Sequence, residues 1–176
     1  GVKSAQDGRM APDIHKSAPV PVPTSMNLTS ADLDFAVPAE GQRLRVIEII
    51  PNQIITGQRI LEATTAGGYV VADPARDLAK LAVIERHART GRVGLGFVTG
   101  LGLQRGAVAS SVAHDSHNIV AAGVVDTDIQ AAVEAIIAMQ GGLAVVDDGR
   151  VRAALPLPIG GLMSDAPLPT VCSRLD

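Results

Sequence analysis

Aromatic residues, cysteine and long apolar runs are scarce in this 176-residue chain, and each scarcity excludes a class of function. Phe, Tyr and Trp together make up 2% of the residues, and the formal net charge is -3. The chain therefore lacks the basic surface and the stacking side chains with which proteins hold nucleic acids, so we expect no nucleic-acid partner. No apolar run approaches the roughly 18 residues of a membrane helix, so we expect no membrane span.

The single cysteine, Cys172, cannot close a disulfide within the chain. The first residues, GVKSAQDGRM, do not have the pattern of a secretory signal. Both observations favour a reducing compartment, and we expect the cytoplasm. What remains is a chain with 47% hydrophobic residues, long enough for one medium domain or for one domain with a tail.

Residues 1–30 differ from the rest of the chain, because they are rich in proline and show no helical or strand periodicity. Within VKSAQDGRM, Asp7 and Gly8 form a turn sequence between two short stretches that can pair as a hairpin. We expect 1–30 to be a hairpin remnant and a Pro-rich connector, with a disordered N-terminus as the alternative. The main domain is expected at 31–166 and a tail at 167–176.

The first part of the main domain is predicted to contain three strands and a helix. The runs RLRVIEII (43–50), QIITGQRI (53–60) and YVVAD (69–73) have the alternation or the β-branched content of strands. A helix is predicted at about 78–90, because apolar residues recur there at a spacing of three to four after a proline that suits a first turn. Glu85, Arg86 and His87 would then form its solvated C-terminal turn.

Further strands and a second helix are predicted beyond residue 90. The glycine-rich segment 91–106 and NIVAAGV (118–124) have the composition of strands. A helix is predicted at about 127–140, capped by Asp126 or Thr127. LAVVDDGRVRAAL is predicted to be a hairpin that turns at Asp148-Gly149. The proline-rich segment from Pro156 to the end is expected to be irregular.

These elements predict an α/β fold. The expected arrangement is a mixed β-sheet with covering helices at about 78–90 and 127–140, preceded by an irregular Pro-rich N-terminal segment.

Five polar residues lie between two hydrophobic runs, and we call them the polar cluster: His114, Asp115, Ser116, His117 and Asn118. Three interpretations are open. The cluster can be a metal site, although flanking strands would turn the two imidazole rings apart unless the chain turns between them. It can be a buried hydrogen-bonded group, or a loop that completes a larger active site or an interface.

Two other motifs lack the features of the sites that they suggest. The glycines of GLGFVTGLGLQRG miss the register of a dinucleotide-binding loop and follow a predicted helix instead of opening one. Ser110 and Ser111 lie close to His114 in sequence, but no nucleophile-elbow motif encloses them. We therefore expect the two serines to hydrogen-bond backbone at the end of a strand.

The combination of motifs nevertheless resembles a known family. LAVIERHARTGRVGLGFVTGLGLQRGAVASSVAHDSHNIVAAG, followed by GGLAVVDDGRVRAALPLPIGGLMSD, is similar to the C-terminal domain of bacterial adenine deaminase, a member of the amidohydrolase superfamily. The similarity runs from about Leu33 to Asp165. VKSAQDGRM also resembles the last hairpin of the small β-sandwich that accompanies amidohydrolase barrels.

The resemblance implies hydrolytic deamination of adenine to hypoxanthine and ammonia. In that family two divalent metals, manganese or iron, lie at the mouth of a (β/α)₈ barrel and activate the attacking hydroxide. The implied partners are the barrel domain of the same polypeptide, adenine as substrate, and further copies in a homo-oligomer.

This chain departs from the family pattern because it has neither the H-x-H pair nor the length of the barrel. No catalytic residue or metal ligand is carried over, and the isolated chain is expected to be inactive. The matching positions are the polar cluster and a supporting segment, Gly160, Gly161, Leu162, Met163, Ser164 and Asp165. We expect the polar cluster to face the barrel mouth, where it contacts the purine or organises the interface.

Two other functions remain open. The chain can be a free-standing domain that binds a small molecule such as a purine, or a structural dimerisation domain that needs no ligand.

Overall fold

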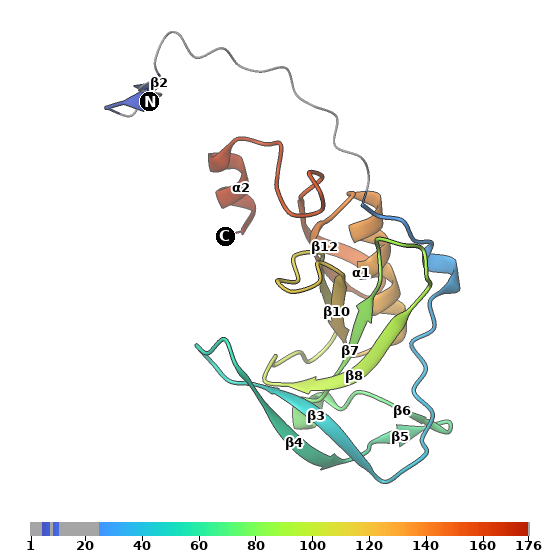
Figure 1. Cartoon of the computed structure of the whole chain (residues 1–176). Helices are drawn as coiled ribbons and strands as arrows, with labels where there is room; N and C mark the ends of the chain where they lie inside the picture. Colours follow the sequence, from blue (N-terminus) through green and yellow to red (C-terminus); the bar gives the residue numbers. More distant parts are fainter. Residues whose placement is uncertain (1–4, 8, 11–24, 176) are drawn as a thin grey trace.

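An eight-stranded sheet forms the centre of the fold (Figure 1). The computed structural model describes residues 5–7, 9–10 and 25–175. In chain order, the strands of this sheet are β3 (Arg43–Ile49), β4 (Thr56–Glu62), β7 (Ala79–Ile84), β8 (Val93–Thr99), β9 (Ala107–Ser110), β10 (Ile119–Gly123), β11 (Gly142–Asp147) and β12 (Arg150–Pro156). Their order in space is β12-β11-β9-β10-β7-β8-β3-β4. Neighbouring strands are antiparallel except β3 and β8, which are parallel, so the predicted mixed sheet is confirmed.

Smaller elements complete the fold. Two short pairs lie outside the main sheet: β1 (Ala5–Gln6) with β2 (Arg9–Met10), and β5 (Thr65–Ala66) with β6 (Tyr69–Val70). The first pair lies where the sequence predicts an N-terminal hairpin, whereas most of the predicted connector lies outside the described residues. The helices are α1 (Asp126–Ala138) and α2 (Leu168–Leu175), with single 3-10 turns at Ser30–Asp32 and Pro74–Arg76. None of the helices in the described part of the chain has the length and apolar character needed to cross a membrane.

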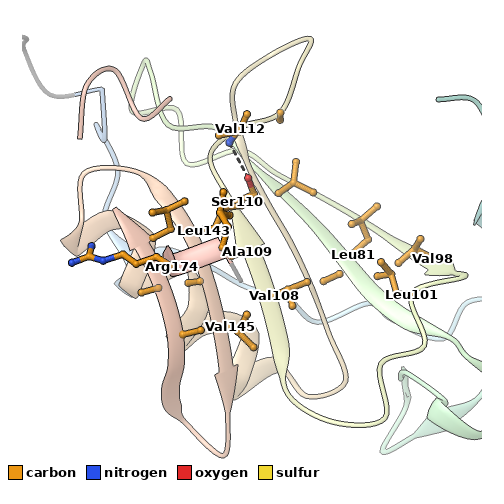
Figure 2. A pocket seen from close by; sticks show the side chains of 18 of the residues that line it. Leu81, Val98, Leu101, Val108, Ala109, Ser110, Val112, Leu143, Val145 and Arg174 are labelled. Atoms are coloured by element: carbon orange, nitrogen blue, oxygen red, sulfur yellow. Dashed lines mark hydrogen bonds between the residues drawn. The ribbon is translucent and has the colours of Figure 1, made fainter. Parts of the chain in front are cut away.

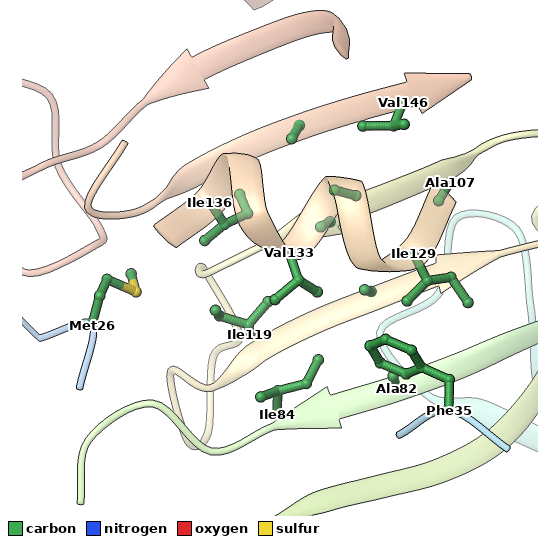
Figure 3. Packing of buried hydrophobic residues seen from close by; sticks show 14 residues of the cluster. Met26, Phe35, Ala82, Ile84, Ala107, Ile119, Ile129, Val133, Ile136 and Val146 are labelled. Carbon is green, nitrogen blue, oxygen red and sulfur yellow. The ribbon is translucent and has the colours of Figure 1, made fainter. Parts of the chain in front are cut away.

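The main core lies between α1 and one face of the sheet (Figure 3). Ile129, Val133 and Ile136 of α1 are fully buried against the strands. Met26 and Phe35, from the segment that precedes β3, are buried in the same cluster. Residues before the predicted start of the domain at 31 therefore contribute to its core.

The predicted helix at 78–90 is wrong, because this segment forms strand β7 and the turn after it. β7 lies in the middle of the sheet, between β10 and β8, and residues pointing to either face are buried or half-buried. A strand buried on both faces reads as a continuous apolar run, in which a helical spacing can be found by coincidence. Pro74 begins a 3-10 turn, and Asp77, at φ 51°, leads into the strand.

The helix predicted at 127–140 is confirmed as α1, but its predicted side-chain cap is wrong. Val125 occupies the N-cap position without a side-chain cap hydrogen bond. Asp126 instead binds the buried Lys80 ammonium, with Oδ1 and Nζ 2.6 Å apart. The main-chain carbonyl of Phe35 accepts a second hydrogen bond from the same ammonium at 2.7 Å. This contact joins α1, β7 and the N-terminal segment.

The last two predictions for local structure have opposite outcomes. The Asp148-Gly149 turn joins β11 to β12, with φ 55° and 66°, as the hairpin sequence predicted. The segment after β12 is not irregular throughout, because it ends in α2.

Candidate functional site: a polar loop held by a buried arginine

Among the residues that the structure describes, Arg86 is the largest side chain that is fully buried, with 1% of its surface exposed. Its guanidinium group joins three segments that are far apart in sequence. Nε donates to the carbonyl oxygen of His117, Nη2 donates to that of Gly160 at 3.1 Å, and Nη1 donates to the carbonyl and hydroxyl oxygens of Ser25. Burial lowers the pKa of Arg86, yet a guanidinium remains charged at neutral pH. The sequence prediction of a solvated turn is wrong for this residue.

Ser111 binds the C-terminal segment at Gly161, next to the Gly160 carbonyl that Arg86 binds. It is completely buried, and its hydroxyl donates to the carbonyl of Gly161 at 2.6 Å and accepts from the N–H of Gly142 at 2.8 Å. Ser110 accepts a hydrogen bond from the N–H of Val112 at 3.0 Å. The expectation that the two serines bind backbone at a strand end is confirmed.

The supporting segment turns tightly between these anchors. Ile159 and Met163 exchange backbone hydrogen bonds of 3.0 and 3.2 Å, with Gly160 at φ 66° and Gly161 at φ 75° between them. A Cβ on Gly161 would lie 2.9 Å from Nη1 of Arg86, so any other residue here would displace the guanidinium. At the far end of the segment Met163 and Asp165 are exposed, and the Ser164 hydroxyl accepts from the N–H of Ala166.

The polar cluster follows β9 as a loop whose base is fixed and whose tip is open. The N–H of His117 donates to the carbonyl of Ala113 at 2.7 Å, and the carbonyl of Ser116 lies 3.1 Å from Nε2 of His87. His117 is at φ 51°, a left-handed conformation that reverses the chain. At the tip, Nδ1 of His114 lies 3.1 Å from Oδ1 of Asp115.

The two histidines have different environments. The side chains of His114 and Asp115 are 100% and 99% exposed, so their pair presents a donor and an acceptor to whatever meets the loop. His117 and Asn118 are half-buried, and Nδ1 of the former and Oδ1 of the latter are enclosed without a hydrogen-bond partner among the described residues. Enclosed polar atoms of this kind are uncommon and call for a partner.

The residues present do not fit the two-metal site that the family resemblance implies. In the part of the chain that the structure describes, no three His, Cys, Asp or Glu side chains come together as metal ligands. His114 and Asp115 form a single exposed pair, and one such pair falls short of the three or four ligands that protein metal sites use.

A groove of about 670 Å³ begins beside the polar cluster (Figure 2). Ser110, Val112 and Ala113 belong to its lining and lead directly into the loop. The rest of the lining is mostly aliphatic. It comes from β3, from β7 to β12 and from the loop at Leu101, with Arg174 and Leu175 of α2 at one side. A groove with so few polar groups favours packing against an apolar surface over orienting a polar ligand such as a purine.

Sequence reasoning missed Arg86, although a signal for it was present. Ala82 and Ile84 of β7 face the core under α1, and Arg86 continues the same alternation two residues later. Once the segment is read as a strand, this spacing places Arg86 on the buried side.

The sequence that forms this sheet and loop matches known proteins. Residues 53–176 match the family model described as the adenine deaminase C-terminal domain. The chain belongs to this family, as its motifs predicted.

Relatives with the name adenine deaminase match most or all of the chain. The protein of Desulfatibacillum aliphaticivorans is 47% identical over all 176 residues, and that of Oleidesulfovibrio alaskensis is 57% identical over 139 residues, 79% of this chain. The protein of Methanothrix thermoacetophila is 47% identical over 94% of the chain. The chain spans only 31%, 24% and 29% of the length of these relatives, so each carries a much larger part that this chain lacks.

Proposed function

We propose that this chain forms the C-terminal domain of an enzyme that converts adenine and water to hypoxanthine and ammonia. The support is its family and the activity that the names of its relatives state. The reacting centre is assigned to the part that the relatives have in addition. There the resemblance implies a barrel with two manganese or iron ions, which would activate the attacking water.

Within this proposal, the domain contributes a positioned surface and no catalytic group. The observation that carries this role is the contrast between the base and the tip of the polar cluster. Arg86 is fully buried and fixes the carbonyl of His117, whereas His114 and Asp115 are completely open to contact. A fixed base with a free His–Asp pair is the arrangement of a loop that completes a site built elsewhere. The conformational entropy of ordering the loop is lost when the domain folds, so it is not lost again when the site forms.

The division of the chain and its location belong to the same proposal. The hairpin and connector span 1–30, the domain proper spans 31–166 with Met26 packed onto it, and 167–176 form a tail. The cytoplasm is the proposed compartment.

The test is steady-state kinetics of a polypeptide in which this chain is joined to the larger upstream part of a relative. His114→Ala or His117→Ala should lower kcat/KM by more than about tenfold, or about 1.4 kcal/mol of transition-state stabilisation, with metal content and unfolding midpoint unchanged. Unchanged kinetics in both variants would contradict a role of the loop in the site.

Two controls complete the experiment. Asp148→Asn changes an exposed turn acid, and Asn tolerates its left-handed conformation, so this variant should retain full activity while Asp115→Asn does not. The isolated 176-residue chain should release no ammonia from adenine. Activity from that chain would place the reacting centre here, and tight binding of adenine to it would favour a free-standing purine-binding domain.

A further inference from the structure

The sheet has a second apolar face, turned away from α1, which the described helices leave uncovered except where Arg174 and Leu175 of α2 line its groove. Along β7, Ala82 and Ile84 point toward α1, while Leu81 and Val83 point the other way. An antiparallel sheet with one solvated face alternates apolar and polar residues. Here the outward positions are aliphatic as well, so the sequence is that of a sheet buried on both sides.

The uncovered face contains a hydrophobic cluster of its own. Ala79, Val98 and Ala122 are buried at its centre, and the partly buried side chains packed around them include Ile49 and Val108. These residues come from β3, β7, β8, β9 and β10, so the cluster spans the middle of the sheet. Apart from Leu103, in the loop between β8 and β9, its members belong to strands, in contrast to the cluster under α1.

The groove of about 670 Å³ lies on this face. Figure 2 shows Leu143 and Val145 on one side, Val108 in the middle, and Leu81 and Leu101 on the other side. Val145 is 43% exposed and Leu101 is 37% exposed, although both are large aliphatic side chains. A continuous apolar patch of this kind usually marks a surface that another protein surface covers.

Continuity with the polar cluster indicates the occupant. Val112 and Ala113 line the groove, and His114 follows directly as the first residue of the loop tip. A body that meets His114 and Asp115 from outside also meets the groove. The relatives, of which this chain spans 31% or less, contain a body of sufficient size in the same polypeptide.

We infer that the groove on the uncovered sheet face is the docking surface for the larger part of the polypeptide that precedes this domain in its relatives. Burial of the apolar side chains on β7 to β11 supplies the binding energy. The fixed loop beside the groove determines how the upstream part is aligned with this domain. This inference rests on the proposed function in one respect, namely that the chain is the end of a longer polypeptide.

The test compares thiol labelling in two polypeptides: this chain alone, and this chain joined to the upstream part of the Desulfatibacillum aliphaticivorans relative. Cys172→Ser removes the native thiol in both. Val145→Cys then places a probe in the groove. Val151→Cys is the matched control, because Val151 is 50% exposed, lies on neighbouring β12 and does not line the groove. Labelling is measured at each peptide by mass spectrometry.

The expected result is protection at residue 145 alone. Its labelling rate should fall by at least about tenfold in the longer polypeptide, while that at residue 151 changes by less than about twofold. Leu101→Cys, in the loop on the other side of the groove, should give the same protection and serves if Val145→Cys fails to fold.

Three outcomes would overturn the inference. Equal labelling at residue 145 in both polypeptides would leave the face open to solvent. Protection in the isolated chain that grows with concentration, together with a dimer in sedimentation, would assign the groove to a second copy. Protection in the isolated monomer would mean that α2 or another part of this chain covers it. Labelling requires no activity, so a polypeptide that deaminates adenine without protection sinks this inference and leaves the proposed function standing.

Discussion

Arg86 donates a hydrogen bond from Nε to the carbonyl oxygen of His117, 31 residues away in sequence, and thereby fixes the base of the polar cluster. The same guanidinium group reaches Gly160 and Ser25, so a single side chain determines the relative position of three loops. A planar donor with several N–H groups in fixed directions is required for this, and lysine cannot replace it.

Replacing Arg86 should therefore destabilise the domain even when the charge is kept. Arg86→Lys is expected to lower the free energy of unfolding by about 2–4 kcal/mol, because buried carbonyl groups lose their donors. Urea denaturation followed by circular dichroism measures the change. Arg92→Lys, at an exposed position six residues away, should stay within about 0.5 kcal/mol. Equal stability of Arg86→Lys and the unmodified chain would contradict the anchoring role.

Gly160 and Gly161 offer a matched pair for testing the close approach to Arg86. Both have positive φ, but a Cβ on Gly160 meets nothing within 4 Å, whereas one on Gly161 meets the guanidinium. Gly160→Ala should cost about 1 kcal/mol from backbone strain alone. Gly161→Ala should cost at least about 1 kcal/mol more, since the neighbouring side chain must also move. Chemical denaturation of the two variants side by side decides the point, and equal costs would rule out the contact as the reason for glycine.

The Lys80–Asp126 pair should show coupling in a double-mutant cycle. Lys80 is 4% exposed, so Asp126→Asn removes the counter-charge of a buried ammonium and leaves it with uncharged acceptors alone. We expect a loss of about 1.5–3 kcal/mol in unfolding free energy. In a Lys80→Met background the same replacement should cost only about 0.3–1 kcal/mol, the contribution of an acid in the first turn of α1. Additive effects would mean that the two side chains act independently.

Glu85 predicts a pH dependence of stability. The N–H of Ala88 donates to its carboxylate at 2.8 Å and, with the N–H groups of Thr90 and His87, lowers the pKa of Glu85 from 4.5 to about 2. Because the folded state favours the ionised carboxylate, the contribution of Glu85 is fully present above about pH 4.5 and is lost as the pH falls toward 2.

Glu85→Gln should thus be less stable than the unmodified chain at pH 7, with a difference that shrinks between pH 4.5 and 2. Unfolding midpoints measured across this range test the sign. Glu40→Gln, at an exposed position, controls for the loss of a surface carboxylate. A difference that grows on acidification would show that the hydrogen bonds do not favour the ionised form.

The parts of the fold that sequence reasoning predicted are those governed by local chemistry. The Asp148-Gly149 turn needs two residues that accept positive φ, and α1 has a single apolar stripe, so short windows suffice for both. β7 was misread because its neighbours on both sides, β10 and β8, determine its burial and no short window contains them. The polar cluster can be identified from its own residues, but its anchor, Arg86, cannot. The acceptors of Arg86 lie 31 to 74 residues away and become visible only once the chain is folded.

The parallel pairing of β3 with β8 bears on where a stable fragment can be cut. Ile47 and Glu48 pair with Val98 and Thr99, and β3 alone separates β4 from the rest of the sheet. A truncated chain starting at residue 53, where the family match begins, would retain β4 and delete the strand that attaches it. The deletion would also remove Met26 and Phe35 from beneath α1. The autonomous folding unit therefore extends upstream of the family match, and a soluble fragment should include the chain from Ser25 onward.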